Sequence, residues 1–231
     1  MGGGYHDAML RAIIFDFDGV IADTEPLHFR AFAQALDGRG VMPSEEEYFA
    51  DYVGLNDETF IRQVHAGAGR KLDPDELKTL RSVKDRAYMS MIAGGLALLP
   101  GVEDFINRVC RRWKLAVCSG ARRVEIELVL ARAGLAEHFV TIVSADEAPI
   151  SKPDPAGFLV AVDELSKHLA GLRPCECLAI EDSRNGIRAA RSAGLRVLAV
   201  GALAESAQDQ TDAFAPSLVD VTYTDLTALF R

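Results

Sequence analysis

The chain has 231 residues, which is enough for one large domain or two small ones with a sizeable core. Its apolar fraction of 49% and charged fraction of 26% are typical of a soluble globular protein. The formal net charge of -9 argues against non-specific binding to nucleic acid or to an anionic membrane. No apolar stretch approaches the roughly 18 residues of a spanning helix, so we expect neither nucleic acid nor membrane as a partner.

The cysteines and the N-terminus indicate the cellular compartment. The four cysteines show neither a C-x-x-C spacing nor a second ligand pair for zinc. They are Cys110, Cys118, Cys175 and Cys177. Free thiols in a reducing compartment are the simplest interpretation. Residues 1–7 lack the basic and apolar regions of a signal peptide, so we interpret them as a short flexible lead-in. A cytoplasmic protein is expected.

The first part of the chain combines one strand with a helical block. The largely apolar segment at residues 12–17 predicts a buried strand. Apolar residues at helical spacing over 29–36 then predict a helix. Ser44 to Glu47 is a capping-box spacing, Asn56 is a candidate cap of a third helix, and Asp73-Pro74 opens a long fourth helix. Residues 25–93 are therefore predicted to form a small all-helical domain.

From residue 102 onward, short apolar strands alternate with amphipathic helices. Strands are predicted at 115–118, 141–143, 177–180 and 197–200, with a short one near 219–223. Helices are predicted at 102–112, 122–133, 155–165, 185–193 and 224–229. This alternation indicates an α/β fold with a doubly wound, Rossmann-like parallel sheet. The first strand belongs to that sheet, so residues 1–24 and 94–231 form the predicted core and the helical cap domain is an insertion.

Asp16 and Asp18 follow the first strand at positions i and i+2. In an extended segment running through Phe17, both carboxylates would project from one face. Ligands of open α/β sheets bind at the carboxyl ends of the strands. Two neighbouring carboxylates repel each other unless a cation or a shared proton holds them. The pair therefore predicts a metal-assisted chemical site.

Three further polar clusters follow predicted strands and should reach the same sheet edge. They are Ser119-Gly120, Ser151-Lys152-Pro153 and Glu181-Asp182-Ser183. Carboxylate oxygens together with a substrate phosphate suit Mg²⁺. Lys152 would balance the phosphate charge, Ser119 could donate to a phosphoryl oxygen, and Gly120 allows backbone N–H groups to approach closely.

These four motifs, in this order, resemble those of the haloacid-dehalogenase (HAD) superfamily. The helical insertion after the first motif resembles the C1 cap of its beta-phosphoglucomutase and phosphoglycolate-phosphatase-like branch. The match continues through residues 182–190, Asp-Ser-Arg-Asn-Gly-Ile-Arg-Ala-Ala, and the resemblance covers nearly the whole chain.

The resemblance implies a role for each motif residue. Asp16 matches a nucleophile that forms an aspartyl phosphate, and Asp18 matches the acid that protonates the leaving oxygen and then activates water. Mg²⁺ would be held by Asp16, the backbone carbonyl of Asp18 and Asp182, with Glu181 behind these ligands. Lys152, Ser119 and Gly120 would bind the phosphate. Because a halide leaves unprotonated, an acid at Asp18 favours phosphoryl transfer over carbon–halogen cleavage.

Four other residues are candidate substrate contacts, each with an ordinary alternative. His28, at the start of the cap, resembles a substrate-contacting histidine of phosphoglucomutase relatives, but a partly buried histidine is nearly as good an interpretation. Lys84 is by default a helix-surface lysine, and Arg122 a residue of a solvated first helical turn. Asn56 lies in a cap loop and is also a helix cap.

The leading functional hypothesis is a Mg²⁺-dependent phosphatase for a small phosphorylated metabolite, such as a sugar phosphate or related organophosphate. A beta-phosphoglucomutase-type phosphomutase is the alternative. The resemblance places a phosphate-gripping arginine of the mutases in residues 54–58, where this chain has an acidic residue instead. A non-enzymatic phosphate- or metal-binding regulator ranks third because Asp16 and Asp182 are both present. The acidic surface favours a monomer.

Overall fold

The computed structural model describes residues 9–52, 55–95, 98–148, 150–201 and 210–231. The predicted lead-in at residues 1–7 and Gly54 of the cap loop lie outside these ranges. The chain divides into two compact units, one comprising Met1–Asp23 and Ala97–Arg231 and the other Thr24–Leu96. None of the helices in the described ranges is long and apolar enough to cross a membrane.

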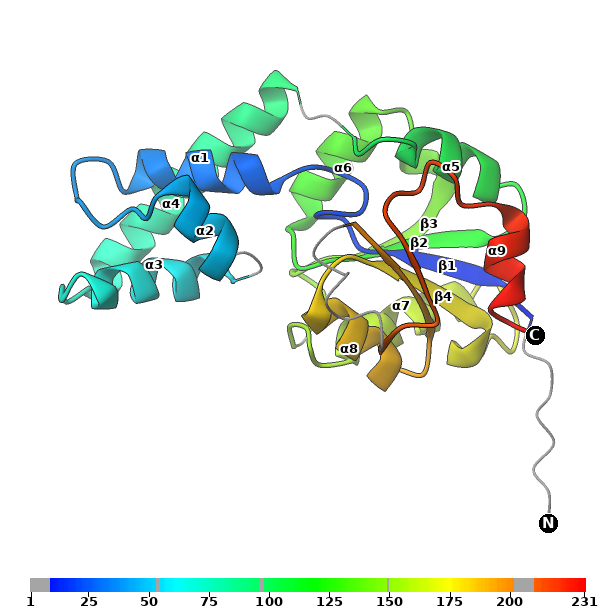
Figure 1. Cartoon of the computed structure of the whole chain (residues 1–231). Coiled ribbons are helices and arrows are strands. Elements are labelled where there is room, and N and C mark those ends of the chain that lie inside the picture. Colours follow the sequence, from blue (N-terminus) through cyan, green and yellow to red (C-terminus); the bar gives the residue numbers. More distant parts are fainter. Residues whose placement is uncertain (1–8, 53–54, 96–97, 149, 202–209) are drawn as a thin grey trace, which may run out of the picture. The chain divides into compact units, whose positions relative to one another are not determined.

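The first unit is built on a six-stranded sheet of parallel neighbours in the order β3-β2-β1-β4-β5-β6 (Figure 1). The strands are β1 (Ala12–Phe15), β2 (Lys114–Cys118), β3 (Phe139–Val143), β4 (Cys177–Glu181), β5 (Arg196–Val200) and β6 (Ala213–Ala215). The chain order reverses direction at β1, which is the switch point where ligands of doubly wound sheets bind. The predicted fold class is confirmed.

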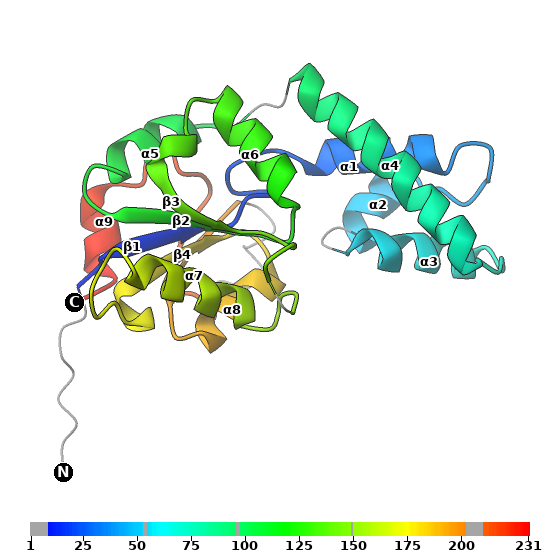
Figure 2. The ribbon, with the colours of Figure 1, turned by 180° about the vertical axis from the view of Figure 1, so that it is seen from behind.

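Helices cover both faces of this sheet. They are α5 (Val102–Val109), α6 (Arg123–Arg132), α7 (Ala156–Ser166), α8 (Arg184–Ser192) and α9 (Tyr223–Ala228), with short 3₁₀ turns at Ala136–His138 and Pro174–Glu176. Helices α7 and α8 lie on one face, and α5 and α6 lie on the other (Figures 1 and 2). Covered on both faces, β1 reads as the uninterrupted apolar run Ala-Ile-Ile-Phe, with every residue buried.

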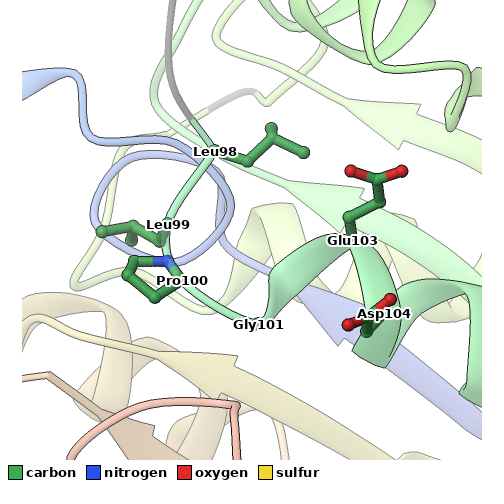
Figure 3. Close-up of a pocket in the computed structure, with 6 residues that line it drawn as sticks. All are labelled: Leu98, Leu99, Pro100, Gly101, Glu103 and Asp104. Carbon is green, nitrogen blue, oxygen red and sulfur yellow. The ribbon is translucent and has the colours of Figure 1, made fainter.

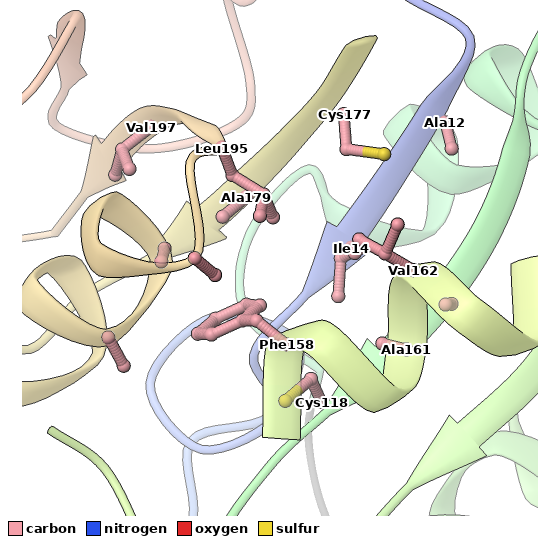
Figure 4. Packing of buried hydrophobic residues seen from close by; sticks show 14 of the residues in the cluster. Ala12, Ile14, Cys118, Phe158, Ala161, Val162, Cys177, Ala179, Leu195 and Val197 are labelled. Atoms are coloured by element: carbon pink, nitrogen blue, oxygen red, sulfur yellow. The ribbon is translucent and has the colours of Figure 1, made fainter. Parts of the chain in front are cut away.

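The layer between the sheet and α7 contains a hydrophobic cluster of buried residues. Phe158 of α7 is fully buried against residues of one sheet face, including Ile14 and Ala179 (Figure 4). Ile14 of β1 and Ala179 of β4 are paired across two neighbouring strands. Paired residues point to the same face of a sheet, so both side chains face α7. The cluster therefore joins α7 to neighbouring strands of the sheet.

The predicted strand near residues 219–223 is wrong. The sixth strand is Ala213–Ala215, and α9 begins at Tyr223. The carboxylate of Asp212 accepts a hydrogen bond from the backbone N–H of Val197 at 2.8 Å, which fixes this segment beside β5. Phe214 also packs against the hydrophobic cluster. Long-range anchoring therefore outweighed the local apolar pattern of residues 219–223.

The second unit consists of four helices, α1 (Glu25–Ala35), α2 (Glu45–Asp51), α3 (Asp57–Gly67) and α4 (Pro74–Gly94). The predicted helix starts are confirmed. Ser44 and Glu47 form a capping box, Asn56 accepts from the N–H of Thr59, and Asp73 accepts from that of Glu76. Buried residues from all four helices form one hydrophobic cluster, which includes Phe32, Tyr48, Phe60 and Leu80.

Lys84 of α4 is a buried cation within this helical unit, with 4% of its side chain exposed. Its ammonium donates to both carboxylate oxygens of Asp57 at 2.9 Å. It also lies 5.1 Å from the ring centroid of Phe32 and 4.8 Å from that of Tyr88. The default assignment of a helix-surface lysine is therefore wrong. The sequence pattern contained no sign that Asp57 on α3 is its partner.

We expect the two partners to differ in their effect on stability. Asp57→Ala leaves a buried ammonium without its counter-ion and should lower the free energy of unfolding by about 3 kcal/mol. Lys84→Met should cost less, because it leaves the more exposed Asp57 (24%) to be hydrated. The double variant should be more stable than Asp57→Ala, as measured by urea denaturation followed by circular dichroism. Equal losses in both single variants would contradict this account.

Candidate active site

The site lies at the carboxyl ends of three neighbouring strands, β2, β1 and β4, which contribute Ser119, Asp16 and Glu181-Asp182. Lys152 joins them from the loop before α7. Parallel pairing brings these strand ends to one edge although the residues lie far apart in the chain. The structure thus assembles the polar clusters predicted from the sequence.

Asp16 follows the last residue of β1, and its backbone N–H still donates to the carbonyl of Ile180 at 2.9 Å. The strand ends at Phe15, so the prediction of one extended segment through Phe17 is wrong. The carbonyl of Phe17 accepts from the N–H groups of Ile21 and Ala22 at 2.9 and 3.1 Å, which turns the chain out of the sheet. Asp18 lies in this turn, whereas Asp16 remains anchored to β4.

The side chain of Asp16 is buried, and it lies beside a cation. Asp16 is 7% exposed, and its Oδ1 lies 3.0 Å from Nζ of Lys152. Within the described ranges, Oδ1 accepts no hydrogen bond of good geometry. A buried carboxylate oxygen with spare acceptor capacity is available to a cation or to an incoming electrophile.

Lys152 is held by three oxygen atoms. Its ammonium donates to Glu181 Oε1 at 2.5 Å and to the carbonyl of Cys118 at 3.0 Å, and Asp16 is its third neighbour. The ring centroid of Phe158 lies 5.2 Å away. Burial acts to lower the pKa of Lys152, but the charges of Asp16 and Glu181 outweigh it and raise the pKa above its ordinary value. The lysine is therefore charged at neutral pH.

Glu181 and Asp182 are acids at the end of β4. Burial, and then the negative charge of Asp16, raise the pKa of Glu181 although Lys152 opposes the shift. The same two causes raise the pKa of Asp182 well above its ordinary value. Asp182 also lies against Gly19, where an added Cβ would stand 2.0 Å from Oδ2. A positive φ of 73° and this close approach both require glycine at position 19.

The acidic cluster fits a divalent cation. Asp16, Glu181 and Asp182 each offer a carboxylate oxygen, and these atoms lie within 4.8 Å of one another. Burial and the negative charge of Asp16 both disfavour a charge on Asp182, and a bound cation would offset them. Oxygen donors of this kind are those that Mg²⁺ prefers. Both oxygens of Glu181 are already engaged, one by Lys152 and the other by Ser183, so Asp16 and Asp182 are the less encumbered ligands.

Ser119 and Gly120 form the loop after β2. Ser119 is 4% exposed, its N–H donates to the carbonyl of Val143 at 3.0 Å, and its Oγ accepts from the N–H of Ala121 at 3.1 Å. As an acceptor in this contact, the hydroxyl keeps its own proton for donation. Gly120 is exposed. The loop can therefore present a hydroxyl and backbone groups to an anion.

The four candidate substrate contacts each have a local partner in the structure. Asn56 caps α3, and Lys84 binds Asp57. His28 stacks on Tyr88 with ring centroids 4.2 Å apart, and burial, followed by the charge of Lys84, lowers its pKa well below the usual range. Arg122 binds Glu125 through Nε at 2.8 Å. These contacts explain the positions of the four side chains with no need for a bound ligand. A role in substrate binding stays a prediction for each of them.

Two groups at the site were not assigned a role from the sequence. Ser183 Oγ donates to Glu181 Oε2 at 3.3 Å and accepts from the N–H of Gly186 at 3.1 Å. The carbonyl of Cys118 accepts from Lys152. Ser183 directly precedes a helix, and this N-cap signal could have identified it from the sequence. The Cys118 carbonyl is a backbone group, which no side-chain motif reveals.

A separate hollow of about 410 Å³ lies at the start of α5. Its lining residues are Leu98, Leu99, Pro100, Gly101, Glu103 and Asp104 (Figure 3). None of the residues of the four motifs lines this hollow. Its acidic side chains do not suit a phosphorylated ligand, so it is not the site described above.

Comparison with known proteins agrees with this geometry. The family model described as haloacid dehalogenase-like hydrolase matches residues 10–194. Protein CbbY of Rhodobacter capsulatus is 34% identical over 200 residues, covering 82% of this chain and 84% of that protein. Fructose-1-phosphate phosphatase YqaB of Escherichia coli (strain K12) is 32% identical over 183 residues, covering 79% of this chain and 92% of that protein.

A solved structure shows the same similarity. The crystal structure of CbbY from Rhodobacter sphaeroides in complex with phosphate superimposes with a TM-score of 0.79 at 29% identity. The similarity covers 92% of this chain and 96% of that one. The matched span includes all four strand-end motifs, from Asp16 to Asp182. This chain therefore belongs to the haloacid dehalogenase-like hydrolase family.

Proposed function

We propose that the protein is a Mg²⁺-dependent phosphatase that hydrolyses a small phosphorylated metabolite through an aspartyl phosphate on Asp16. The observation that supports this most is the buried Asp16 carboxylate, 3.0 Å from the Lys152 ammonium and clustered with Glu181 and Asp182. The similarity to a fructose-1-phosphate phosphatase supports a sugar phosphate as the substrate class. A cytoplasmic location and a monomeric state stay predictions.

In the first step, an oxygen of Asp16 forms a bond to phosphorus while the bond from phosphorus to the substrate oxygen breaks. Lys152 supplies a fixed positive charge for the transferred phosphoryl group. The Ser119 hydroxyl donates a hydrogen bond to one of the phosphoryl oxygens. Because the ammonium is already held by Glu181 and the Cys118 carbonyl, little reorganisation is needed when substrate binds.

Asp18 moves the proton in both halves of the reaction. It donates a proton to the departing substrate oxygen, since an alkoxide is a poor leaving group. In the second half, the resulting carboxylate takes a proton from water while the water oxygen attacks phosphorus. The bond between phosphorus and Asp16 then breaks, and inorganic phosphate leaves. Asp18 lies in the turn that directly follows Asp16.

The carboxylate cluster supports a proposal for the metal ligands. Asp16 and Asp182 would hold Mg²⁺ through carboxylate oxygens, and Asp18 through its backbone carbonyl. When bound, Mg²⁺ neutralises charge on the phosphoryl oxygens and on the acidic cluster. Gly19 keeps the Asp182 carboxylate close to the turn that contains Asp18. Glu181 serves mainly as the anchor of Lys152.

We expect Asp16→Asn to abolish phosphate release from p-nitrophenyl phosphate, because an amide is a far weaker nucleophile than a carboxylate. EDTA should likewise abolish the parent activity, and added MgCl₂ should restore it. Asp163→Asn, on the exposed surface of α7, is the matched control and should retain full activity. Unchanged turnover in Asp16→Asn would exclude its assignment as nucleophile.

Asp18→Asn should separate the two halves of the reaction. The nitrophenolate group leaves without protonation, so Asp16 should still become phosphorylated by the aryl ester. Hydrolysis of that intermediate should stall without the base, leaving a phosphorylated protein detectable by mass spectrometry. Mg²⁺ affinity, measured by calorimetry, should change little because only the backbone carbonyl ligates. Loss of Mg²⁺ binding in this variant would contradict the assignment.

A panel of sugar monophosphates, beginning with fructose 1-phosphate, should identify substrates. We expect stoichiometric release of inorganic phosphate, with a higher kcat/KM than for p-nitrophenyl phosphate because the sugar contributes binding energy. Conversion of beta-glucose 1-phosphate to the 6-phosphate with little free phosphate would instead establish a phosphomutase. The product analysis therefore distinguishes the two activities directly.

A further inference from the structure

The Glu181 side chain is in close contact with the first turn of α8, at Gly186. Glu181 ends β4 and is fully buried, and Gly186 is the third residue of α8. A Cβ built on Gly186 would lie 2.0 Å from Cδ, Oε1 and Oε2 of Glu181. The carboxylate therefore occupies the volume that the first side-chain atom of any other residue would fill.

We propose that Gly186 is a positioning residue, whose missing side chain sets the place of the Glu181 carboxylate and, through it, of the Lys152 ammonium. This inference rests on the proposed role of Lys152 in binding the phosphoryl group. Gly186 itself touches neither substrate nor metal.

The hydrogen bonds around Glu181 show how the position is transmitted. Oε1 accepts from Lys152 at 2.5 Å, and Oε2 accepts from Ser183 Oγ at 3.3 Å. Ser183 Oγ in turn accepts from the N–H of Gly186 at 3.1 Å. Hydrogen bonds thus link Lys152, both carboxylate oxygens of Glu181 and the start of α8 in one network. A displaced carboxylate would give up both bonds and leave Lys152 paired only with Asp16 and the Cys118 carbonyl.

The carboxylate has little freedom to move aside. Only Asp182 and Ser183 connect β4 to α8, and β4 is an interior strand held between β1 and β5. Glycine is also a less favourable helix residue than alanine. Helix propensity alone would therefore favour alanine at position 186. A loss of function in Gly186→Ala would run against that preference and would point to the carboxylate.

The test compares Gly186→Ala with the parent in two assays, phosphatase kinetics and calorimetric binding of inorganic phosphate in the presence of Mg²⁺. We expect kcat/KM to fall about 100-fold, as for a displacement of about 1 Å at a reacting site. Phosphate affinity should fall as well. Gly67→Ala, at the end of α3, is the control because a Cβ there meets no atom within 4 Å, and it should match the parent.

The conservative double variant distinguishes positioning from general loss of packing. Glu181→Asp shortens the side chain by one methylene and makes room for a Cβ at position 186. Gly186→Ala/Glu181→Asp should therefore recover part of the activity and phosphate affinity lost in Gly186→Ala. Parent-like behaviour of Gly186→Ala, or additive losses in the double variant, would overturn the proposal.

A third pair of variants applies if Gly186→Ala does not fold. Glu181→Ala removes the carboxylate, so adding Gly186→Ala should then lower neither the urea midpoint nor the phosphate affinity further. An additional loss in that background would overturn the proposal. Failure of the proposed function would appear differently, as absence of turnover in the parent across the phosphoester panel. Phosphate binding by the variants still tests the position of Lys152 in that case.

Discussion

The ion pairs of Lys152 with Asp16 and Glu181 are the interaction on which the site depends. Two buried carboxylates at neighbouring strand ends would repel each other, and a single ammonium 3.0 Å from one and 2.5 Å from the other keeps them together. The same arrangement leaves the lysine charged at neutral pH. The cluster nevertheless remains acid-rich, because Asp182 adds a further carboxylate, and this excess suits a divalent cation.

The sheet supplies the rigidity that this cluster requires. The strands β2, β1 and β4 are interior to the sheet and packed on both faces, so the residues at their ends cannot drift apart. Two glycines then make the close approaches possible. Gly19 accommodates Asp182 and Gly186 accommodates Glu181, each where a Cβ would stand 2.0 Å from the carboxylate. The site is thus defined as much by missing side chains as by those present.

Much of the fold and of the site was predictable from the sequence. Short apolar runs alternating with helical apolar patterns predicted the α/β fold, and the cap signals at Ser44, Asn56 and Asp73 predicted three helix starts. The predictions failed where distant residues decide the outcome. The last strand formed at Ala213–Ala215 because Asp212 is anchored to Val197, and Lys84 is buried because Asp57 on another helix neutralises it. A local pattern contains neither partner.

The sequence by itself predicted a metal-assisted site, because polar clusters after apolar strands meet at one edge of a parallel sheet. The expectation of phosphoryl transfer came from the resemblance of the four motifs to the haloacid-dehalogenase superfamily. The sequence also determined the order of strands and helices, since apolar periodicity is a local property. Only the tertiary structure decided the task of each acid. Glu181 is the partner of Lys152 because the fold brings together side chains 29 residues apart, and Gly186 is needed because that carboxylate fills its space. Contacts of this kind depend on packing in three dimensions, which residue spacing does not encode.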